Sequence, residues 1–211
     1  RGILSIKYFW LISILISIYG CKGNMVAQIS KREQLIRSAL ELFSRKGYHA
    51  VGVDAISEKA GITKRTLYHH FKSKEELILA ALRNYDERFR NDFMRSVEAK
   101  TQSPTGRLLA VFDVVEEWFN NKNISGCIFV GAMGEYPEED TPIRHVCKES
   151  KKLTQEYIKG LVEKAGLQRA DQLSGQIVLL IEGAITMAQV NNFSLSAFQA
   201  KEAAKVLIEN S

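Results

Sequence analysis

Apolar side chains recur every three or four residues through most of this chain, and that spacing limits what it can fold into. The clearest run places Leu35, Ile36, Ala39 and Phe43 on one side of a helix. Proline, which interrupts helices, occurs only three times in 211 residues. The periodicity therefore predicts an all-α protein, long enough to bury one large core or one core and a small second domain.

Positive charge is concentrated near the start of the chain. Residues 31–80 hold ten Lys and Arg against six Asp and Glu, whereas residues 81–211 hold sixteen against eighteen. A basic front section followed by a nearly neutral body is typical of a nucleic-acid-binding domain joined to a domain with another task.

Residues that carry catalytic or metal chemistry are sparse. The three cysteines, Cys21, Cys127 and Cys147, form no CxxC pair, and the four histidines lack the spacing of metal ligands. We therefore expect no disulfide framework, no metal and no cofactor, and a reducing cytoplasm as the location. The sequence contains no P-loop, dinucleotide-binding motif or nucleophile–base motif, so we do not expect an enzyme.

Residues 1–24 form an almost continuously apolar prefix that ends near Cys21. We expect the prefix not to be part of the working protein, because Met25 opens a segment that leads straight into an amphipathic helix. A membrane tether and a secretory or lipoprotein signal are the two alternatives. For the rest of the chain we expect no membrane partner.

Residues 53–71 have the pattern of two short helices joined by a tight turn. Ile56 faces inward from the first helix, Gly61 supplies the turn, and Leu67 faces inward from the second. Thr63 stands where it can cap the second helix. With the helix predicted before it, over residues 30–46, this segment makes a three-helix, helix-turn-helix domain whose last helix enters the major groove of DNA.

The outward side of that last helix carries cations, hydroxyls and an imidazole, which suit phosphate oxygens and base edges. The next helix opens at a Ser73–Glu76 capping box, where N–H groups can also face phosphate. We predict DNA contacts from Thr63, Lys64, Arg65, Thr66, Tyr68, His69 and Lys74. The alternative is an ordinary helical hairpin with solvated cations, which does not explain why Tyr68 and His69 are displayed beside them.

The segment 61–77, GITKRTLYHHFKSKEEL, resembles the signature of the TetR family of transcriptional repressors, and the likeness runs from Ser30 to Leu82. The resemblance implies a DNA-binding domain at residues 25–76 and a larger helical domain at 77–211 for effector binding and dimerisation. The chain departs from the family at Val51, where members often carry Ser or Thr, and at Arg65, where they often carry a small residue. The set of residues that contact the operator therefore cannot be inferred from other members of the family.

Beyond residue 77 the periodicity predicts further helices near 103–119, 126–136, 141–166, 177–190 and 196–209. The family resemblance implies that a small apolar effector is enclosed among them. We predict a pocket formed by Trp118, Cys127, Phe129, Met133 and Tyr157. Taken singly, each of these side chains fits ordinary core packing better than ligand binding, and that alternative stays open.

The resemblance also implies a homodimer in which the last two helices pair with their copies in a four-helix bundle. Two recognition helices would then face successive major grooves of a near-palindromic, double-stranded operator. Repression is the family's common mode, and activation stays open. As an alternative to ligand release, Cys127 could sense oxidants or electrophiles, because helix-start N–H groups favour a thiolate; an inert buried cysteine is the plainer interpretation.

Overall fold

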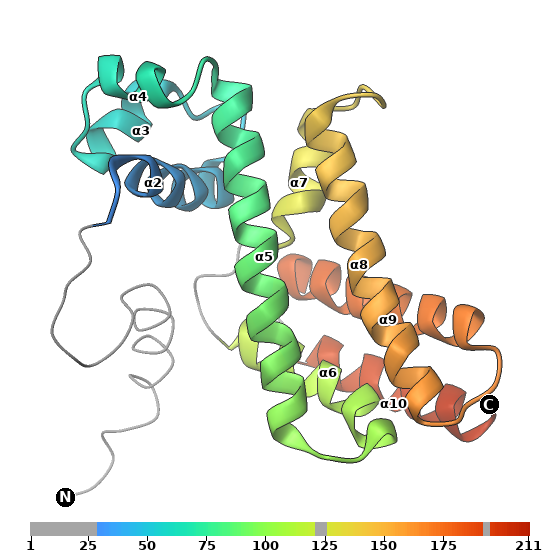
Figure 1. Cartoon of the computed structure of the whole chain (residues 1–211). Coiled ribbons are helices and arrows are strands. Elements are labelled where there is room, and N and C mark those ends of the chain that lie inside the picture. Colours follow the sequence, from blue (N-terminus) through green and yellow to red (C-terminus); the bar gives the residue numbers. More distant parts are fainter. Residues whose placement is uncertain (1–28, 121–125, 192–194) are drawn as a thin grey trace, which may run out of the picture. The chain divides into compact units, whose positions relative to one another are not determined.

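The computed structural model describes residues 29–120, 126–191 and 195–211, and within these ranges every regular element is an α-helix, which confirms the predicted fold class. The nine helices in these ranges are α2 (Lys31–Lys46), α3 (Val53–Ala60), α4 (Lys64–His70), α5 (Lys74–Lys100), α6 (Pro104–Phe119), α7 (Ile128–Glu135), α8 (Pro142–Lys164), α9 (Ala170–Asn191) and α10 (Leu195–Glu209). All of them belong to one unit, Lys31–Ser211 (Figure 1). The predicted prefix 1–24, including Cys21, lies outside the described residues.

Four helices begin at a hydroxyl residue that caps them. Thr63, Ser73, Ser103 and Thr141 each accept a hydrogen bond from the backbone N–H three residues later, at 3.1–3.2 Å. At two of these caps, before α6 and α8, a proline follows directly. A cap of this kind is typically worth about 1 kcal/mol, so the sequence itself fixes where these helices start.

One hydrophobic core joins α2, α3 and α4 to the first turns of α5. We call α2, α3 and α4 the head; Figure 1 shows them gathered at one end of α5. Leu35, Ile56 and Leu67 are fully buried in this core together with Leu77 from α5. The same core also takes in α7 and the start of α8, through side chains that include Phe129, Ala132, Ile143 and Cys147.

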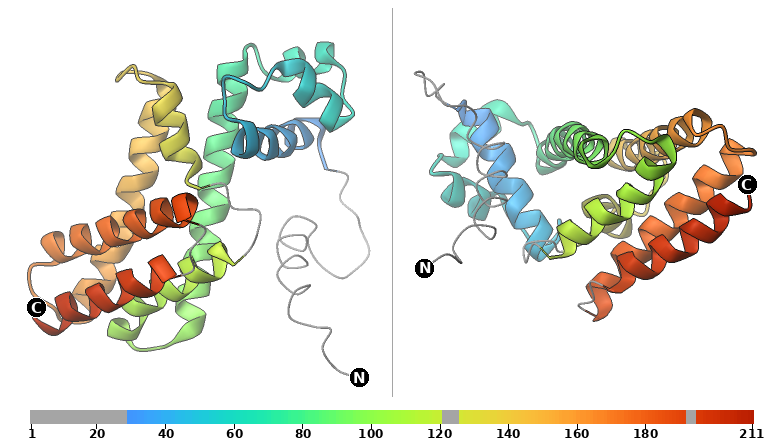
Figure 2. Two further views of the ribbon diagram at one scale, coloured as in Figure 1. Left: turned by 180° about the vertical axis from the view of Figure 1, so that it is seen from behind. Right: turned by 90° about the horizontal axis from the view of Figure 1, so that it is seen from below.

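A second hydrophobic core joins the rest of α5 to α6, α9, α10 and the later turns of α8. Phe93 and Val97 of α5 lie in it, whereas Leu82 of the same helix lies in the first core. Helix α5 is therefore shared by both cores. Helices α9 and α10 pack against each other and lie side by side in the view from behind (Figure 2).

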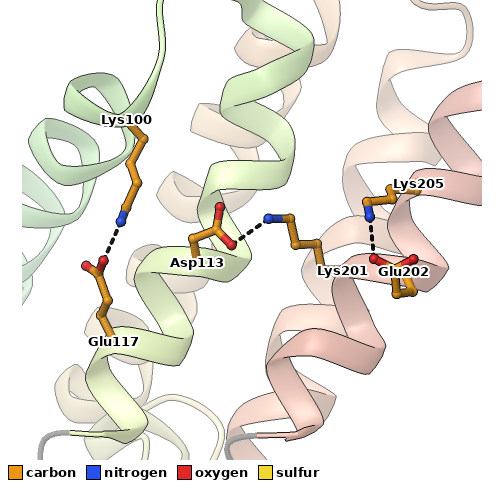
Figure 3. Close-up of polar contacts among 6 residues, drawn as sticks. All are labelled: Lys100, Asp113, Glu117, Lys201, Glu202 and Lys205. Atoms are coloured by element: carbon orange, nitrogen blue, oxygen red, sulfur yellow. Dashed lines mark hydrogen bonds and ion pairs between the residues drawn. The ribbon is translucent and has the colours of Figure 1, made fainter.

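We call α6 to α10 the body, which α5 connects to the head. Ion pairs join neighbouring helices at the edge of the second core. Lys201 of α10 binds Asp113 of α6 at 2.5 Å, and Lys100 at the end of α5 binds Glu117 of α6 (Figure 3). Because these side chains are partly exposed, each pair contributes at most about 1 kcal/mol. The apolar contacts, and not these ion pairs, hold the body together.

Candidate DNA-binding surface and effector site

The turn between α3 and α4 has the geometry of a helix-turn-helix. Gly61 ends α3 in the left-handed region at φ 63°, a conformation that glycine adopts without strain. Its N–H donates to Glu58 O at 3.0 Å, and the N–H of Ile62 donates to Ser57 O at 2.9 Å. These two bonds stop α3 and turn the chain toward α4. The buried side chain of Leu67 then fixes α4 against the core.

The solvent side of α4 displays four of the predicted DNA contacts. Lys64, Arg65, Tyr68 and His69 are all exposed, and Tyr68 keeps 46% of its surface. Arg65 and His69 lie one turn apart on the same side of the helix. A guanidinium, a phenol and an imidazole presented together suit hydrogen bonding to phosphates and base edges. Their contact with DNA stays a prediction.

Lys64 has a protein partner in the free chain. Its ammonium lies 2.9 Å from the carboxylate of Asp54 on α3, and the hydrogen bond and charge of Asp54 raise the pKa of Lys64 above its ordinary value. The pair is exposed, so it is weak and can be replaced by a phosphate. Asp54 therefore orients Lys64 across the helix-turn-helix, a role that the sequence did not suggest.

The hydroxyls of Thr63 and Thr66 lie together at the first turn of α4. Thr63 Oγ1 accepts from the N–H of Thr66 at 3.2 Å and lies 2.9 Å from Thr66 Oγ1. Thr63 therefore caps α4, as the sequence predicted. Because these oxygens point at each other, any contact that they make with DNA uses only their remaining lone pairs or protons.

Lys74 stands at the first turn of α5, half-buried beside the head. Its ammonium donates to the carbonyl oxygen of His49 at 3.2 Å. Ser73 caps the helix as predicted, but Glu76 accepts from the N–H of Lys72 at 2.6 Å and not from that of Ser73. Lys74 therefore lies next to the N-terminus of α5, which suits the predicted phosphate contact.

An aromatic ladder connects three of the five predicted pocket residues. Its members are Tyr85, Phe89 and Phe93 of α5, with Trp118, Phe129 and Tyr157 beside them. Trp118 lies 4.3 Å from Phe89 and 5.3 Å from Phe93, measured between ring centroids. Successive rings one turn apart on α5 thus bring together side chains that are far apart in the sequence.

The five predicted pocket residues divide between the two cores. Trp118 and Tyr157 pack on the second core, whereas Cys127, Phe129 and Met133 pack on the first. The hydroxyl of Tyr157 is buried and has no hydrogen-bond partner among the described residues. Burial, aided by the charge of Glu98, raises the pKa of Tyr157 to about 12, so this hydroxyl stays neutral.

A cavity of about 320 Å³ opens between α5 and α8, and no residue of the ladder lines it. Its lining is largely charged and comprises Arg83, Asp86, Glu87, Arg90, Val146, Glu149, Ser150 and Leu153. None of the five predicted pocket residues lines it. Within the described parts of the chain, no group of three or more His, Cys, Asp or Glu side chains is placed to hold a metal ion.

Cys127 lies in a polar setting that the sequence did not reveal. It occupies the N-cap of α7, and the ammonium of Lys151 from α8 lies 3.3 Å from its sulfur. Lys151 also binds Glu182 of α9 at 2.6 Å. Burial opposes the charged form of Lys151, but Cys127 and Glu182 outweigh it and raise its pKa above the ordinary value. A cation therefore faces the thiol.

Helices α9 and α10 leave a large apolar surface uncovered. Six of the large hydrophobic side chains that are exposed in the single chain belong to this pair: Leu179, Met187, Val190, Leu195, Phe198 and Val206. In the described part of the chain, one stretch, Ala170–Val190 of α9, is long and apolar enough to cross a membrane, and only 28% of its most apolar window is buried. An exposed apolar face of this extent marks a binding surface.

Comparison with known proteins finds the same two-part organisation. Residues 35–81 match the family described as "Bacterial regulatory proteins, tetR family", and residues 104–200 match "Transcriptional regulator LmrA/YxaF-like, C-terminal domain". The transcriptional regulator YxaF of Bacillus subtilis is 28% identical over 188 residues, which cover 87% of this chain and 98% of YxaF. The transcriptional activator FasR of Mycolicibacterium smegmatis is 36% identical over 98 residues, which cover 45% of each chain.

The fold is shared as well. The crystal structure of SCO4454, a TetR-family regulator from Streptomyces coelicolor, superposes with a TM-score of 0.80 at 24% identity, over 85% of this chain and 95% of that one. The two family matches include both the helix-turn-helix and most of the body behind it. This chain therefore belongs to the TetR family of DNA-binding transcriptional regulators.

Proposed function

We propose that this regulator is a cytoplasmic repressor that binds a palindromic operator as a homodimer and is released by a small apolar ligand. The observation that carries the proposal is the surface of α4, where Arg65, Tyr68 and His69 are exposed on a helix fixed by its cap, its turn and a buried leucine. A recognition helix needs this combination of free polar side chains and a rigid position.

The exposed face of α9 and α10 supports dimerisation. A second copy placing the same two helices against this face would form a four-helix bundle and cover side chains such as Leu179 and Phe198. The twofold axis would then relate two heads, which accounts for the expected palindrome. The apolar character of α9 is explained by this interface without a membrane.

The aromatic ladder supports an apolar, flat effector. Its rings supply apolar faces, and the hydroxyl of Tyr157, which has no partner among the described residues, supplies one hydrogen-bonding group next to Phe93. Sites for small molecules commonly combine many apolar walls with few polar groups. A ligand would bind beside Phe93, which contacts both Trp118 and Tyr157, and Phe129 would respond through its contact with Tyr85 of the same ladder.

The test of DNA recognition is selection of duplexes from a random-sequence pool by the purified full chain. We expect an enriched inverted repeat, and we expect Arg65→Ala to relax base preference at one position in each half-site. Arg95→Ala is the matched control, because Arg95 is exposed on the body end of α5. Enrichment of no sequence, or of one without a repeat, would contradict the proposal. Transcription in vitro from a promoter carrying the selected site then separates repression from activation.

A second candidate function is favoured by Lys151. In this version an oxidant, and not a bound ligand, releases DNA: the Cys127 thiolate attacks a peroxide oxygen, the O–O bond breaks, hydroxide leaves and takes a proton, and a sulfenic acid remains. The ammonium of Lys151 lies 3.3 Å from the sulfur that would be oxidised. Hydrogen peroxide should then release DNA from the wild type and from Cys147→Ser but not from Cys127→Ser. Equal release from both variants would reject the thiol sensor.

A further inference from the structure

The loop that follows α2 is held by the last residue of α7. The two carboxylate oxygens of Glu135 accept hydrogen bonds from consecutive backbone N–H groups, that of Tyr48 at 2.7 Å and that of His49 at 2.5 Å. These N–H groups belong to the head, and Glu135 belongs to the body. Charged acceptors make the stronger hydrogen bonds of proteins, so this is a firm attachment.

Side chains of the same loop extend the attachment along α7. The hydroxyl of Tyr48 donates to the carbonyl oxygen of Ile128, at the first residue of α7, at 2.9 Å. The Nε2 of His49 donates to the carbonyl oxygen of Glu135 at 2.7 Å, and its ring lies 4.8 Å from that of Tyr136. Both ends of α7 are thus tied to two adjacent residues of the head.

Gly47 leaves room for the Glu135 carboxylate beside the loop. Its φ of +82° lies in the left-handed region, and a Cβ at this position would stand 2.7 Å from Glu135 Oε1. A side chain here would therefore strain the backbone and displace the carboxylate. Two separate requirements, the turn and the approach of Glu135, favour glycine.

The attachment reaches the DNA-facing side of the head. The carbonyl oxygen of His49 accepts from the ammonium of Lys74, the predicted phosphate contact at the start of α5. The carboxylate of Glu135 thus binds the loop at Tyr48 and His49, and the loop in turn binds the ammonium of Lys74. At the other end of α7, Cys127 contacts Lys151 of α8.

We infer that Glu135 is a positioning residue for DNA binding: it fastens the head to α7 and adds a polar connection to those of α5 and the shared hydrophobic core, which already join head and body. We call Glu135 with Tyr48 and His49 the latch. The inference rests on the proposed function only in that DNA is the ligand. A shift of α7 moves the latch, the loop and Lys74 together, so a change in the body alters how the head meets DNA.

The experiment compares Glu135→Ala, Glu135→Gln and the control Glu139→Ala in the full chain. Glu139 is exposed in the segment after α7, and no hydrogen bond or ion pair joins its side chain to another described residue. The first measurement is amide hydrogen exchange at Tyr48 and His49. Because each N–H is deprived of a charged acceptor, Glu135→Ala should speed exchange about 10- to 100-fold, Glu135→Gln should be intermediate, and the control should be unchanged.

The second measurement is affinity for a duplex selected by the wild-type chain. A loosened head must be ordered when DNA binds, so Glu135→Ala should weaken binding about tenfold, while Glu139→Ala should not. DNA should also slow amide exchange within α7 of the wild type, and this response should disappear in Glu135→Ala.

Unchanged exchange at Tyr48 and His49 in Glu135→Ala would overturn the latch itself. Faster exchange with unaltered DNA affinity and an intact α7 response would overturn its role in positioning the head. If the wild-type chain selects no DNA, the proposed function fails, and the exchange measurement still decides whether the latch exists. The thermal unfolding midpoint of each variant, compared with that of the wild type, checks that the variant is still folded.

Discussion

Replacement of Leu179 by alanine tests the proposed dimer at a single side chain. Leu179 lies on α9 and is 73% exposed in the single chain. Full burial of a leucine side chain is worth about 1.5–3 kcal/mol, so covering the exposed part contributes about 1–2 kcal/mol in each protomer. A twofold interface contains the residue twice, and the total is about 2–4 kcal/mol. Since 1.4 kcal/mol is a factor of ten, the dimer dissociation constant should rise about 30- to 700-fold.

Sedimentation velocity over a dilution series measures that constant directly. The matched control is Val130→Ala, because Val130 is an apolar residue of α7 with 48% exposure that lies outside α9 and α10. The control should dimerise like the wild type. If Leu179→Ala dissociates no more readily than the control, the exposed face of α9 is not the dimer interface. A wild-type chain that stays monomeric at all concentrations would refute the reasoning altogether.

Four further outcomes are expected. Lys74→Ala should weaken binding to all duplexes alike and make the log–log salt dependence shallower by about 0.9 for each phosphate that is no longer neutralised; a change in preference at one base position would contradict the assignment. Leu67→Ala, at a position with 0% exposure, should lower the free energy of unfolding in urea by about 2–5 kcal/mol, and a decrease well below this range would mean that α4 is not anchored there. Burial and the nearby Cys127 raise the pKa of Cys147 to about 11, so iodoacetamide should label it slowly below that pH; rapid labelling at pH 8, seen by mass spectrometry, would be inconsistent with its burial. Once an effector is found, operator DNA should weaken its binding by about 1–3 kcal/mol, and equal affinity in titrations with and without operator would reject ligand release.

Features set by neighbouring residues could be predicted from the sequence. Thr63 and Ser73 cap the helices that they were expected to cap, because each hydroxyl reaches an N–H only three residues away. The turn at Gly61 follows from its freedom to adopt a positive φ. Helix periodicity also located the apolar helices of the body, since their spacing reflects which side faces a core.

Features that join distant segments could not be predicted in this way. Glu135 binds Tyr48 across 87 positions, and nothing in its local sequence distinguishes it from the exposed Glu138 and Glu139. The ammonium of Lys151 beside Cys127 depends on how α7 and α8 pack, which periodicity does not specify. For the same reason the predicted pocket residues, chosen along the chain, divide between two cores.

The sharing of α5 between both cores bears on how this protein can evolve. A change that makes room for a different effector at the proposed site near Phe93 also loosens the helix that carries Leu77 and Leu82 into the core of the head. Most substitutions cost stability, and natural proteins have little of it to spare. Variants that bind a different effector should therefore carry compensating substitutions in α2 to α4. The head would then change in sequence along with the body, although the head does not contact the proposed effector.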